Sequence, residues 1–254
     1  MNEEKTVRAA MVIIGSEILS GRTQDTNLNT LARGLNDVGI VLSEARIVSD
    51  APDAIVAALN ELRARYDYVF TTGGIGPTHD DITAQCVADA FEVPLILNPE
   101  ARALLQAHYD RTGRELNAAR LRMAHTPQGA SLIANPVSTA PGFRIENVYV
   151  LAGVPVVMQA MLDGLKPGLT GGRRVLSRSV GSLVGEGIVA RDLAALQAKY
   201  PALEIGSYPF YRPGGVSGTN IVIRHADAAL IDAALAEAAQ LIRSHGGEPE
   251  FGDG

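Results

Sequence analysis

Apolar and polar positions follow two different periods along the first 170 residues. Short runs of aliphatic and β-branched residues predict buried strands, and between them apolar residues recur at the helical spacing. Strands that alternate with helices are typical of βαβ units, in which a parallel sheet lies between two layers of helices. The pattern therefore predicts a doubly wound, three-layer α/β fold.

The expected elements can be placed by residue number. Strands are expected over Val7–Ile14, Val41–Val48, Asp67–Thr71 and Leu95–Leu97, followed by a pairing of Ala130–Ala134, Gly142–Ile145 and Val148–Leu151. Helices are expected over 27–36, 82–90, 100–111 and 155–165. A further helix is expected after Asp50, which we interpret as its N-cap, because Pro52 and Asp53 suit a first helical turn.

A glycine- and proline-rich segment, KPGLTGGRR, follows residue 165 and predicts a domain boundary near Thr170. The expected domains are therefore 1–170 and 171–254. The second domain reads as strand, helix, strand, strand and a final helix, over 173–180, 187–199, 203–207, 220–224 and a segment capped by Asp227 that ends at Gly246. This order predicts a small α+β domain with helices on one sheet.

Composition narrows the function classes. The chain is 46% hydrophobic and 20% charged with a net charge of −6, so it lacks the basic balance of nucleic-acid-binding proteins. No apolar run approaches the roughly 20 residues of a membrane span, and the acidic start MNEEKTVRAA does not resemble a secretory signal. The single cysteine, Cys86, excludes an internal disulfide, so we interpret it as a core residue and expect a cytoplasmic protein.

The turn after the strand at 67–71 is rich in glycine and reads TTGGIGPTHDD over residues 71–81. Ligands of parallel sheets bind beyond the carboxyl ends of the strands. Glycines let backbone amides approach an anion, and the helix N-terminus that follows adds its dipole. The turn lacks the Gly-Lys-Ser/Thr of a Walker A loop and the third glycine of a Rossmann fingerprint. We therefore predict a phosphate cradle of a different type.

Two adjacent carboxylates, Asp80 and Asp81, close this turn. Carboxylates beside bound phosphate suit Mg²⁺ or Mn²⁺, which prefers oxygen ligands. The alternative is a tight corner in which Thr78 and Asp81 form a capping pair. His79 has two interpretations as well, a solvated loop histidine or a general acid or base.

Three other segments offer polar groups at the ends of strands. In GSEILSGRTQDTN (15–27), one interpretation is that Glu17 or Asp25 completes the contacts to a metal or a substrate hydroxyl. The other is that Glu17 is a solvated acid and that Asp25 or Thr26 caps the next helix. NPVSTAPG (135–142) is small and polar, and LAGVP (151–155) offers amides to an anion. Four arginines form a basic cluster, Arg111, Arg114, Arg120 and Arg122. We interpret it either as a contact to a second phosphate or as an ordinary solvated helix face.

Taken in order, the segments at 15–27, 71–81, 135–142 and 151–155 resemble the N-terminal part of the CinA competence/damage-inducible family. The unit after residue 170 resembles the small KH-type domain that follows in CinA, although it lacks a basic G-x-x-G loop for RNA. The resemblance implies a MoaB/Mog-like, molybdopterin-binding-type fold with a largely parallel sheet, and a homo-oligomer, with a dimer expected. It also implies that the amidohydrolase domain at the C-terminus of many CinA proteins is missing.

The same resemblance implies a divalent-metal-dependent pyrophosphatase that acts on ADP-ribose or FAD-like diphosphates. The resemblance implies that Asp80 and Asp81 are the catalytic and metal-binding residues. The substrate-binding residues it implies are Thr72, Gly73, Gly74, Gly76, Pro77, Thr78, Glu17, Asp25, Asn27, Ser138, Thr139 and Gly153. The metal expected is Mg²⁺, Mn²⁺ or Co²⁺, with K⁺ as a further ion and molybdopterin as a further candidate ligand.

One departure from the family pattern bears on catalysis. Relatives read G-V-P-x-E-M where this chain has GVPVVM, so Val157 replaces an acid. An alternative therefore stays open, a non-catalytic molybdopterin-binding protein linked to molybdenum-cofactor metabolism.

Overall fold

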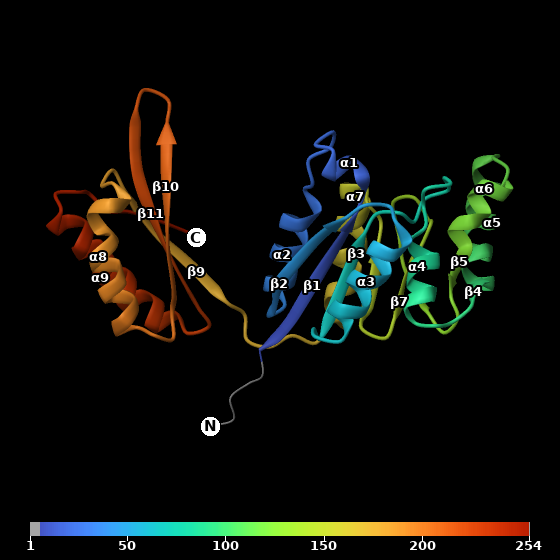
Figure 1. Cartoon of the computed structure of the whole chain (residues 1–254), viewed down its shortest axis with the longest axis horizontal. Helices are drawn as coiled ribbons and strands as arrows, with labels where there is room; N and C mark the ends of the chain where they lie inside the picture. The colour runs from blue at the N-terminus through green and yellow to red at the C-terminus, as the bar shows by residue number, and fades with distance from the viewer. Residues whose placement is uncertain (1–5, 254) are drawn as a thin grey trace. The chain divides into compact units, whose positions relative to one another are not determined.

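The computed structural model describes residues 6–253, so most of the acidic start and Gly254 lie outside it. The chain divides into two compact units, Met1–Arg173 and Arg174–Gly254 (Figure 1). Within residues 6–253, the two units share no sheet and no hydrophobic core.

The first unit contains a six-stranded sheet in the order β2-β1-β3-β8-β7-β6. Four neighbouring strands are parallel, β2 (Ile40–Val48), β1 (Val7–Ile14), β3 (Tyr68–Thr72) and β8 (Val148–Leu151). Two antiparallel strands, β7 (Gly142–Ile145) and β6 (Ser131–Ile133), extend the sheet beyond β8. The sheet is therefore largely parallel, as the sequence predicts.

Helices cover both faces of this sheet. One core lies beneath α3 (Pro52–Arg63) and α4 (Thr83–Ala90), and the other beneath α2 (Asn27–Asp37) and α7 (Pro155–Leu165). Alternate residues of β1 enter the two cores, which explains why this strand is apolar almost throughout. Cys86 on α4 is 1% exposed, and its burial raises the pKa of the thiol to about 11. The three-layer fold and the core position of Cys86 are confirmed.

The strand predicted at 95–97 forms, but it does not join the main sheet. This strand, β4 (Leu95–Leu97), pairs antiparallel with β5 (His125–Pro127) in a separate two-stranded sheet. The place beside β3 belongs to β8, whose residues are all buried. The segment between β4 and β5 carries α5 (Pro99–Thr112), α6 (Ala118–Leu121) and the 3-10 turn η1 (Arg122–Ala124).

Asp50 is not the N-cap of α3. The cap position belongs to Ala51 and has no side-chain hydrogen bond, since the helix begins at Pro52. The Asp50 carboxylate instead accepts a hydrogen bond from the Ser16 amide at 2.8 Å. The Asp50 amide lies 3.3 Å from the Ser16 hydroxyl oxygen, to which it donates. Asp50 thus joins the turn after β2 to α1 (Ser16–Leu19), a single helical turn where a loop was expected.

The second unit has a four-stranded antiparallel sheet in the order β10-β11-β9-β12. Its elements are β9 (Leu176–Ser182), α8 (Glu186–Lys199), β10 (Glu204–Arg212), β11 (Val216–His225), α9 (Ala228–Ser244) and β12 (Glu250–Asp253). Apolar residues of α8 and α9 pack with β9 and β11 in one core, which confirms the α+β class. Asp227 caps α9 as predicted and accepts from the Ala229 amide at 2.9 Å.

Two features of this second sheet exceed the sequence prediction. The β10–β11 hairpin is longer than expected, and β12 was not predicted at all. β12 contains glycine and acidic residues, which have low β-propensity. It forms because it pairs with β9 at the edge of the sheet.

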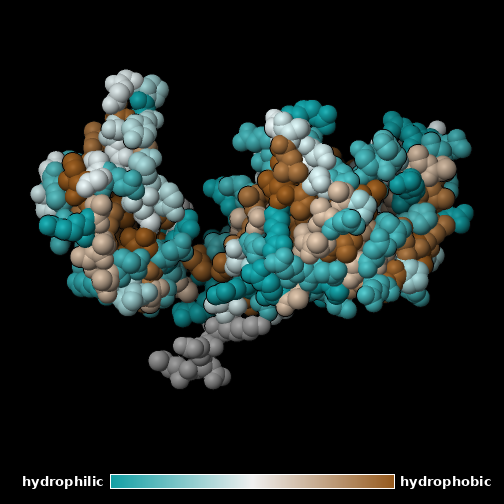
Figure 2. Space-filling model, viewed as in Figure 1, coloured by the Kyte–Doolittle hydropathy of each residue, from teal (hydrophilic) through white to brown (hydrophobic). Residues whose placement is uncertain are grey.

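The visible surface of each unit is largely hydrophilic and carries smaller apolar patches among the hydrophilic residues (Figure 2). Across residues 6–253, every helix is too short or too polar to cross a membrane. This agrees with the lack of a long apolar run in the sequence.

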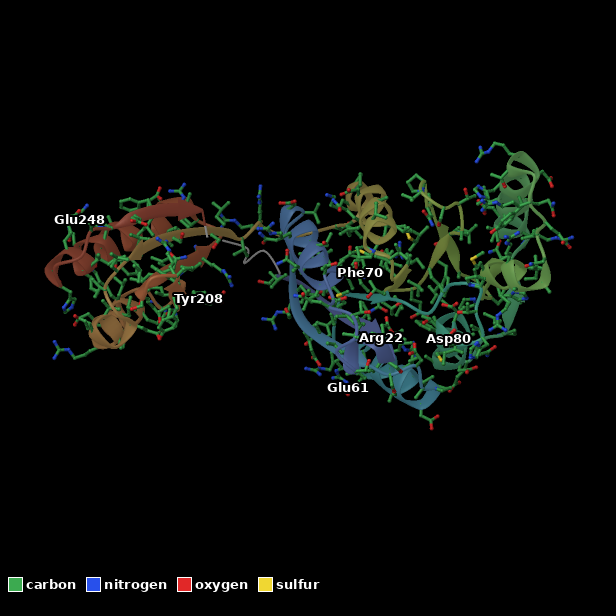
Figure 3. All side chains as sticks on the ribbon, turned by 90° about the horizontal axis from the view of Figure 1, so that it is seen from above. Arg22, Glu61, Phe70, Asp80, Tyr208 and Glu248 are labelled. Atoms are coloured by element: carbon green, nitrogen blue, oxygen red, sulfur yellow. The ribbon has the colours of Figure 1, made fainter. Side chains whose placement is uncertain are left out.

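An ion-pair network on β2 and α3 predicts a pH dependence of stability. Arg46 binds both carboxylate oxygens of Glu61 at 2.7 Å, and this pairing lowers the pKa of Glu61 from 4.5 to about 2. Glu61 is labelled in Figure 3. Because the folded-state pKa is depressed, the stabilisation is present above pH 4.5 and is lost as the pH falls towards 2. We expect Glu61→Gln to reduce the dependence of Tm on pH in this window. Thermal scans between pH 2 and 6 measure it, and Glu248→Gln, at an exposed position, should match the parent chain.

Candidate functional site

The carboxyl ends of β1, β3 and β8 meet at one edge of the main sheet. The turns that follow these strands lie in close contact, since a Cβ built on Gly153 would be 3.1 Å from the Gly73 Cα. A pocket of about 620 Å³ opens at this edge. It is lined by Ile14, Glu17, Arg22, Asp50, Gly73, Gly74, Ile75, Gly76, Pro77, Asp80, Asp81, Met123, Asn135, Ser138, Ala140, Ala152, Gly153, Val154 and Val157. Most of the predicted site residues are therefore brought together.

The glycine-rich turn has a backbone that only glycine accommodates. Gly73 has a φ of 101° and Gly74 a φ of 67°, both in the left-handed region. A Cβ on Gly73 would lie 2.2 Å from the Ile14 carbonyl oxygen of the neighbouring strand. Thr83, the first residue of α4, donates its hydroxyl to the Gly73 carbonyl at 2.9 Å and its amide to the Gly74 carbonyl at 3.0 Å. The turn is therefore held in position before any ligand binds.

Thr78 positions the two carboxylates of this turn. Its amide donates to Asp81 Oδ2 at 2.7 Å, and its hydroxyl oxygen lies 2.6 Å from the same atom and 2.5 Å from Asp80 Oδ1. The hydroxyl lowers the pKa of the Asp80 carboxyl below its ordinary value. The Asp81 carboxylate lies against Gly76, where a Cβ would approach Asp81 Oδ2 to 2.7 Å. Both acids therefore have defined positions on the pocket wall.

The Thr78–Asp81 pair of the tight-corner alternative forms, but it does not cap the helix. Helix α4 begins at Thr83 with Ile82 as its N-cap, so the bond between Thr78 and Asp81 closes the turn ahead of the helix. The His79 side chain is 98% exposed, does not line the pocket and lies 4.0 Å from Asp80. These positions agree with a solvated loop histidine.

The charge of the pocket decides which ligands it accepts. Four carboxylates line it, on Glu17, Asp50, Asp80 and Asp81, against the single guanidinium of Arg22. An anionic ligand is repelled by this excess of negative charge unless a cation lies between them. Within residues 6–253, no three His, Cys, Asp or Glu side chains converge to hold a metal ion by themselves. The donor set fits Mg²⁺-type binding, in which one or two carboxylates act together with water and a substrate phosphate.

Three predicted residues, Thr72, Asp25 and Asn27, line a smaller pocket of about 100 Å³. This pocket shares Ile14, Glu17, Gly73 and Gly153 with the main one. Asn27 Nδ2 donates to the Gly153 carbonyl at 2.8 Å, whereas Asn27 Oδ1 and Thr72 Oγ1 are buried without a hydrogen-bond partner among residues 6–253. Asp25 accepts from the Leu28 amide at 2.9 Å, so it supports the start of α2. The helix-capping interpretation of Asp25 therefore agrees with the structure.

The loop at 135–142 brings one predicted residue to the main pocket. Ser138 lines it together with Asn135, whose Oδ1 accepts from the Val137 and Ser138 amides at 3.0 Å. Thr139 does not line the pocket. Its φ is 69°, and its hydroxyl lies 2.9 Å from Nδ1 of His108. Thr139 and Thr78 thus do not line the pocket, but their hydrogen bonds hold its loops in place.

Ten residues of the pocket were not among the predicted site residues, and three of these are Asp50, Arg22 and Met123. Asp50 was interpreted as a helix cap, yet it follows a parallel strand at the edge where ligands bind, and that signal would have found it. Arg22 lies within a segment that was singled out for its acids. Met123 comes from η1, distant in sequence from the other turns, and no local pattern marks it.

Val157 occupies the third position of α7 and lines the pocket. It is 6% exposed and packs in the core beneath α2 and α7. The position where the family pattern has an acid therefore faces the pocket, and here it presents an apolar surface.

Two families match the chain. Residues 10–171 match the family described as "Probable molybdopterin binding domain", and residues 174–247 match "FAD synthase, middle domain". The matched segment of the first unit has the MoaB/Mog-like fold.

Individual relatives cover different shares of the chain. A protein of Caldivirga maquilingensis is 40% identical over 79% of each chain. A CinA-like protein of Geobacter metallireducens is 34% identical over 98% of this chain and 62% of its own length. The crystal structure of the protein CinA from Thermoplasma acidophilum covers 65% of this chain and 99% of its own, with 32% identity and a TM-score of 0.60.

Proposed function

The chain belongs to the CinA-like family, and from this premise we propose that its glycine-turn pocket hydrolyses the diphosphate bond of a nucleotide such as ADP-ribose or FAD with a divalent metal ion. The observation that carries the proposal is the placement of Asp80 and Asp81 on the wall of a pocket built around a rigid glycine turn. The names of the two matched families support a ligand of nucleotide or pterin type.

Each part of the pocket has a task in this reaction. The turn at Gly73–Gly76 and the start of α7 next to Gly153 offer a backbone environment that favours phosphate. Asp81 and Asp80 are the groups that would hold the metal, and Arg22 is the cation that can bind a phosphate oxygen. When bound, the metal neutralises phosphate charge and lowers the pKa of a bound water. Asp80 is a carboxylate at neutral pH, and the hydrogen bond from the Thr78 hydroxyl lowers its pKa further below the ordinary value.

The test is a direct assay of the full chain. ADP-ribose and FAD are incubated separately with Mg²⁺, Mn²⁺ or Co²⁺ in the presence of K⁺, and AMP is measured by chromatography. We expect AMP release with at least one metal and none in EDTA. A chain that releases no AMP from either substrate with any metal contradicts the proposal.

The second candidate is metal-independent binding of a pterin phosphate such as molybdopterin without hydrolysis. It is favoured by Val157, which leaves apolar surface where the family pattern has an acid. Calorimetric titration in EDTA distinguishes the two, because the pyrophosphatase is expected to bind its anionic ligand weakly without a cation.

Restoring the acid gives a further prediction. Val157→Glu places a carboxylate at a nearly buried position, so without metal we expect the free energy of unfolding to fall by about 1–3 kcal/mol. A divalent ion that binds the pocket should recover part of this loss. Denaturant unfolding with EDTA and with Mn²⁺ measures both effects. Val156→Glu is the matched control, because Val156 is 63% exposed and does not line the pocket. Equal effects of Mn²⁺ on the two variants would contradict a metal at this wall.

A further inference from the structure

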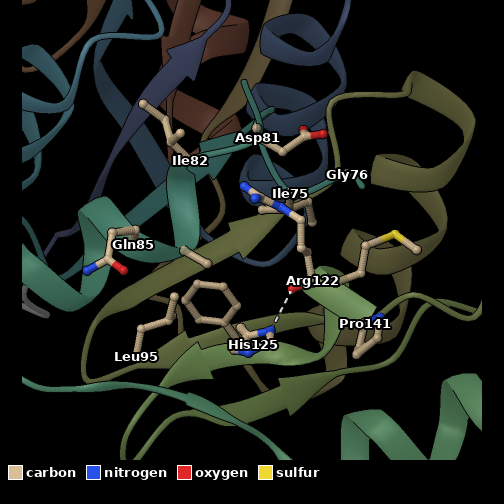
Figure 4. A pocket seen from close by; sticks show the side chains of 13 residues that line it. Ile75, Gly76, Asp81, Ile82, Gln85, Leu95, Arg122, His125 and Pro141 are labelled. Atoms are coloured by element: carbon tan, nitrogen blue, oxygen red, sulfur yellow. Dashed lines mark hydrogen bonds between the residues drawn. The ribbon is translucent and has the colours of Figure 1, made fainter. Parts of the chain in front are cut away.

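A pocket of about 350 Å³ lies against the glycine turn and extends the main site (Figure 4). The two pockets share Gly74, Ile75, Gly76, Asp81 and Met123. Arg122, a member of the basic cluster of the sequence, lines this extension and not the main pocket. The extension therefore belongs to the site already described.

A separate pocket of about 480 Å³ lies in the second unit. We call it the sheet-face pocket, since residues of all four strands line it, among them Ser179, Tyr208, Asn220 and Glu250. Val180 belongs to the core beneath α8 and α9, and side chains alternate along a strand, so Ser179 points to the opposite face. The pocket therefore lies on the face of the sheet that is turned away from both helices (Figure 1).

Glycine forms the floor of the sheet-face pocket. Gly181 pairs with Asn220 on one side and with Glu250 on the other, so these three residues form one row across the sheet. A Cβ built on Gly181 would meet its nearest atom, Asn220 Oδ1, at 3.4 Å, which is an ordinary contact. The packing of the sheet therefore does not require a glycine here. A glycine inside a strand often marks a place where a ligand approaches the backbone closely.

Ser179 gives an independent indication of a ligand. The residue is 4% exposed, lines the pocket, and makes no side-chain hydrogen bond within the part of the chain that the structure describes. Its hydroxyl oxygen lies over Gly252, where a Cβ would approach it to 3.2 Å. Buried hydroxyl groups in folded proteins normally have a hydrogen-bond partner. A ligand in the sheet-face pocket can supply the partner that Ser179 lacks.

Aromatic rings form one side of the pocket. Tyr208 and Phe210 stand two positions apart on β10, and both line it. A Cβ built on Gly206 would lie 3.0 Å from the Tyr208 ring, and a Cβ on Gly218 would lie 2.6 Å from Phe210 Cζ. Both rings thus lie against glycines of the sheet. A flat apolar group fits beside these rings, where it gains aromatic contacts.

Two opposite charges line the pocket without an ion pair. The Arg212 guanidinium lies 4.6 Å from the centre of the Phe210 ring, and neither it nor the Glu250 carboxylate pairs with another charge among the described residues. Arg212 lies on β10 and Glu250 on β12, which are the two edge strands of the sheet. Three strand spacings separate these edges, roughly 14 Å at the backbone. A ligand that reaches both charges is therefore longer than a single amino acid, which carries its ammonium and carboxylate on one carbon.

We propose that the sheet-face pocket binds a short peptide with free ends and an aromatic side chain. The terminal carboxylate pairs with the planar guanidinium of Arg212, and the terminal ammonium pairs with Glu250. The aromatic side chain lies on the glycine floor beside Tyr208, while Ser179 and Asn220 hydrogen bond to the peptide groups. A phosphate is disfavoured, because Glu250 repels its negative charge. This site is independent of the proposed hydrolysis.

Calorimetric titration of the full chain with the tripeptide Gly-Phe-Gly tests the proposal. EDTA is present, so metal-dependent binding in the first unit does not contribute. Three further probes each lack one feature. The N-acetylated tripeptide has no ammonium, the C-terminal amide has no carboxylate, and Gly-Gly-Gly has no ring.

Three variants alter the pocket, Arg212→Gln, Glu250→Gln and Gly181→Val. Valine suits a strand, and at this position its Cβ meets no atom closer than 3.4 Å. Arg224→Gln and Glu204→Gln are the matched controls. These two residues pair with each other on the same face of the sheet and do not line the pocket.

We expect the parent chain to bind Gly-Phe-Gly with a Kd below about 1 mM, and Gly181→Val to weaken this binding about tenfold or more. Arg212→Gln should weaken Gly-Phe-Gly about threefold to fivefold but leave the C-terminal amide unchanged, because that probe has no carboxylate to lose. Glu250→Gln should act in the same way on Gly-Phe-Gly and leave the N-acetylated tripeptide unchanged. Both control variants should bind as the parent chain does.

Three results would overturn the proposal. The first is a parent chain that shows no saturable binding of Gly-Phe-Gly up to about 5 mM. The second is Gly-Gly-Gly binding as tightly as Gly-Phe-Gly, which would exclude a site for the ring. The third is a loss of affinity in Arg224→Gln as large as that in Arg212→Gln, because the effect would then come from the general charge of this face.

Discussion

Replacing Asp81 by asparagine is expected to lower the turnover of the diphosphate substrate by about a hundredfold to a thousandfold, a loss typical of groups that stabilise transition-state charge. The amide oxygen can still accept the hydrogen bond that the Thr78 amide now donates to Asp81 Oδ2 at 2.7 Å. The turn therefore keeps its conformation, and the charge alone is removed. AMP release over a range of substrate and Mn²⁺ concentrations measures the loss and separates kcat from the metal requirement.

The control for this prediction is Asp110→Asn, which removes an exposed carboxylate on α5 and leaves the pocket unchanged. The two variants should have the same Tm to within a few degrees. An Asp81→Asn chain that hydrolyses substrate within twofold of the parent rate would show that this carboxylate has no part in the reaction. The same variant should also bind Mn²⁺ more weakly, because a negatively charged ligand is lost.

Gly73→Ala is expected to lower the free energy of unfolding by about 2–5 kcal/mol and to abolish ligand binding. Two causes add. The φ of 101° is unfavourable for any residue with a Cβ, and that atom would approach the Ile14 carbonyl oxygen to 2.2 Å. The turn must then move away from β1, which displaces the wall that Gly73 forms. Denaturant unfolding measures the first effect and calorimetric titration of ADP-ribose the second.

Gly113→Ala separates these two causes. Gly113 follows α5 with a φ of 66°, and a Cβ there meets no atom within 4 Å. We expect a loss of about 1 kcal/mol and unchanged binding, because only the backbone term applies. If Gly73→Ala costs no more than Gly113→Ala, then the close approach of β3 and β1 does not constrain the turn.

Local patterns in the sequence determined the elements whose stability is itself largely local. The apolar alternation of β1, the N-cap Asp227 of α9 and the start of α7 at Pro155 were placed within a residue or two. The glycine turn was recognised because three glycines between a strand and a helix need a special backbone. The edge of the sheet that carries the candidate site followed from the parallel order of the strands.

The tertiary structure alone decided which distant turns meet. β4 lies outside the main sheet, where β8 is the strand that pairs with β3. β12 forms because it pairs with β9. Asp50 lines the pocket, where its carboxylate accepts a hydrogen bond from the Ser16 amide. The two residues are 34 positions apart, so no local pattern shows this contact. Capping, helical periodicity and turn chemistry act over a few residues, and a sequence displays them directly. Strand order and contacts between turns depend on the packing of the whole unit, so Arg122 and Met123 could be assigned to pockets only from the folded structure.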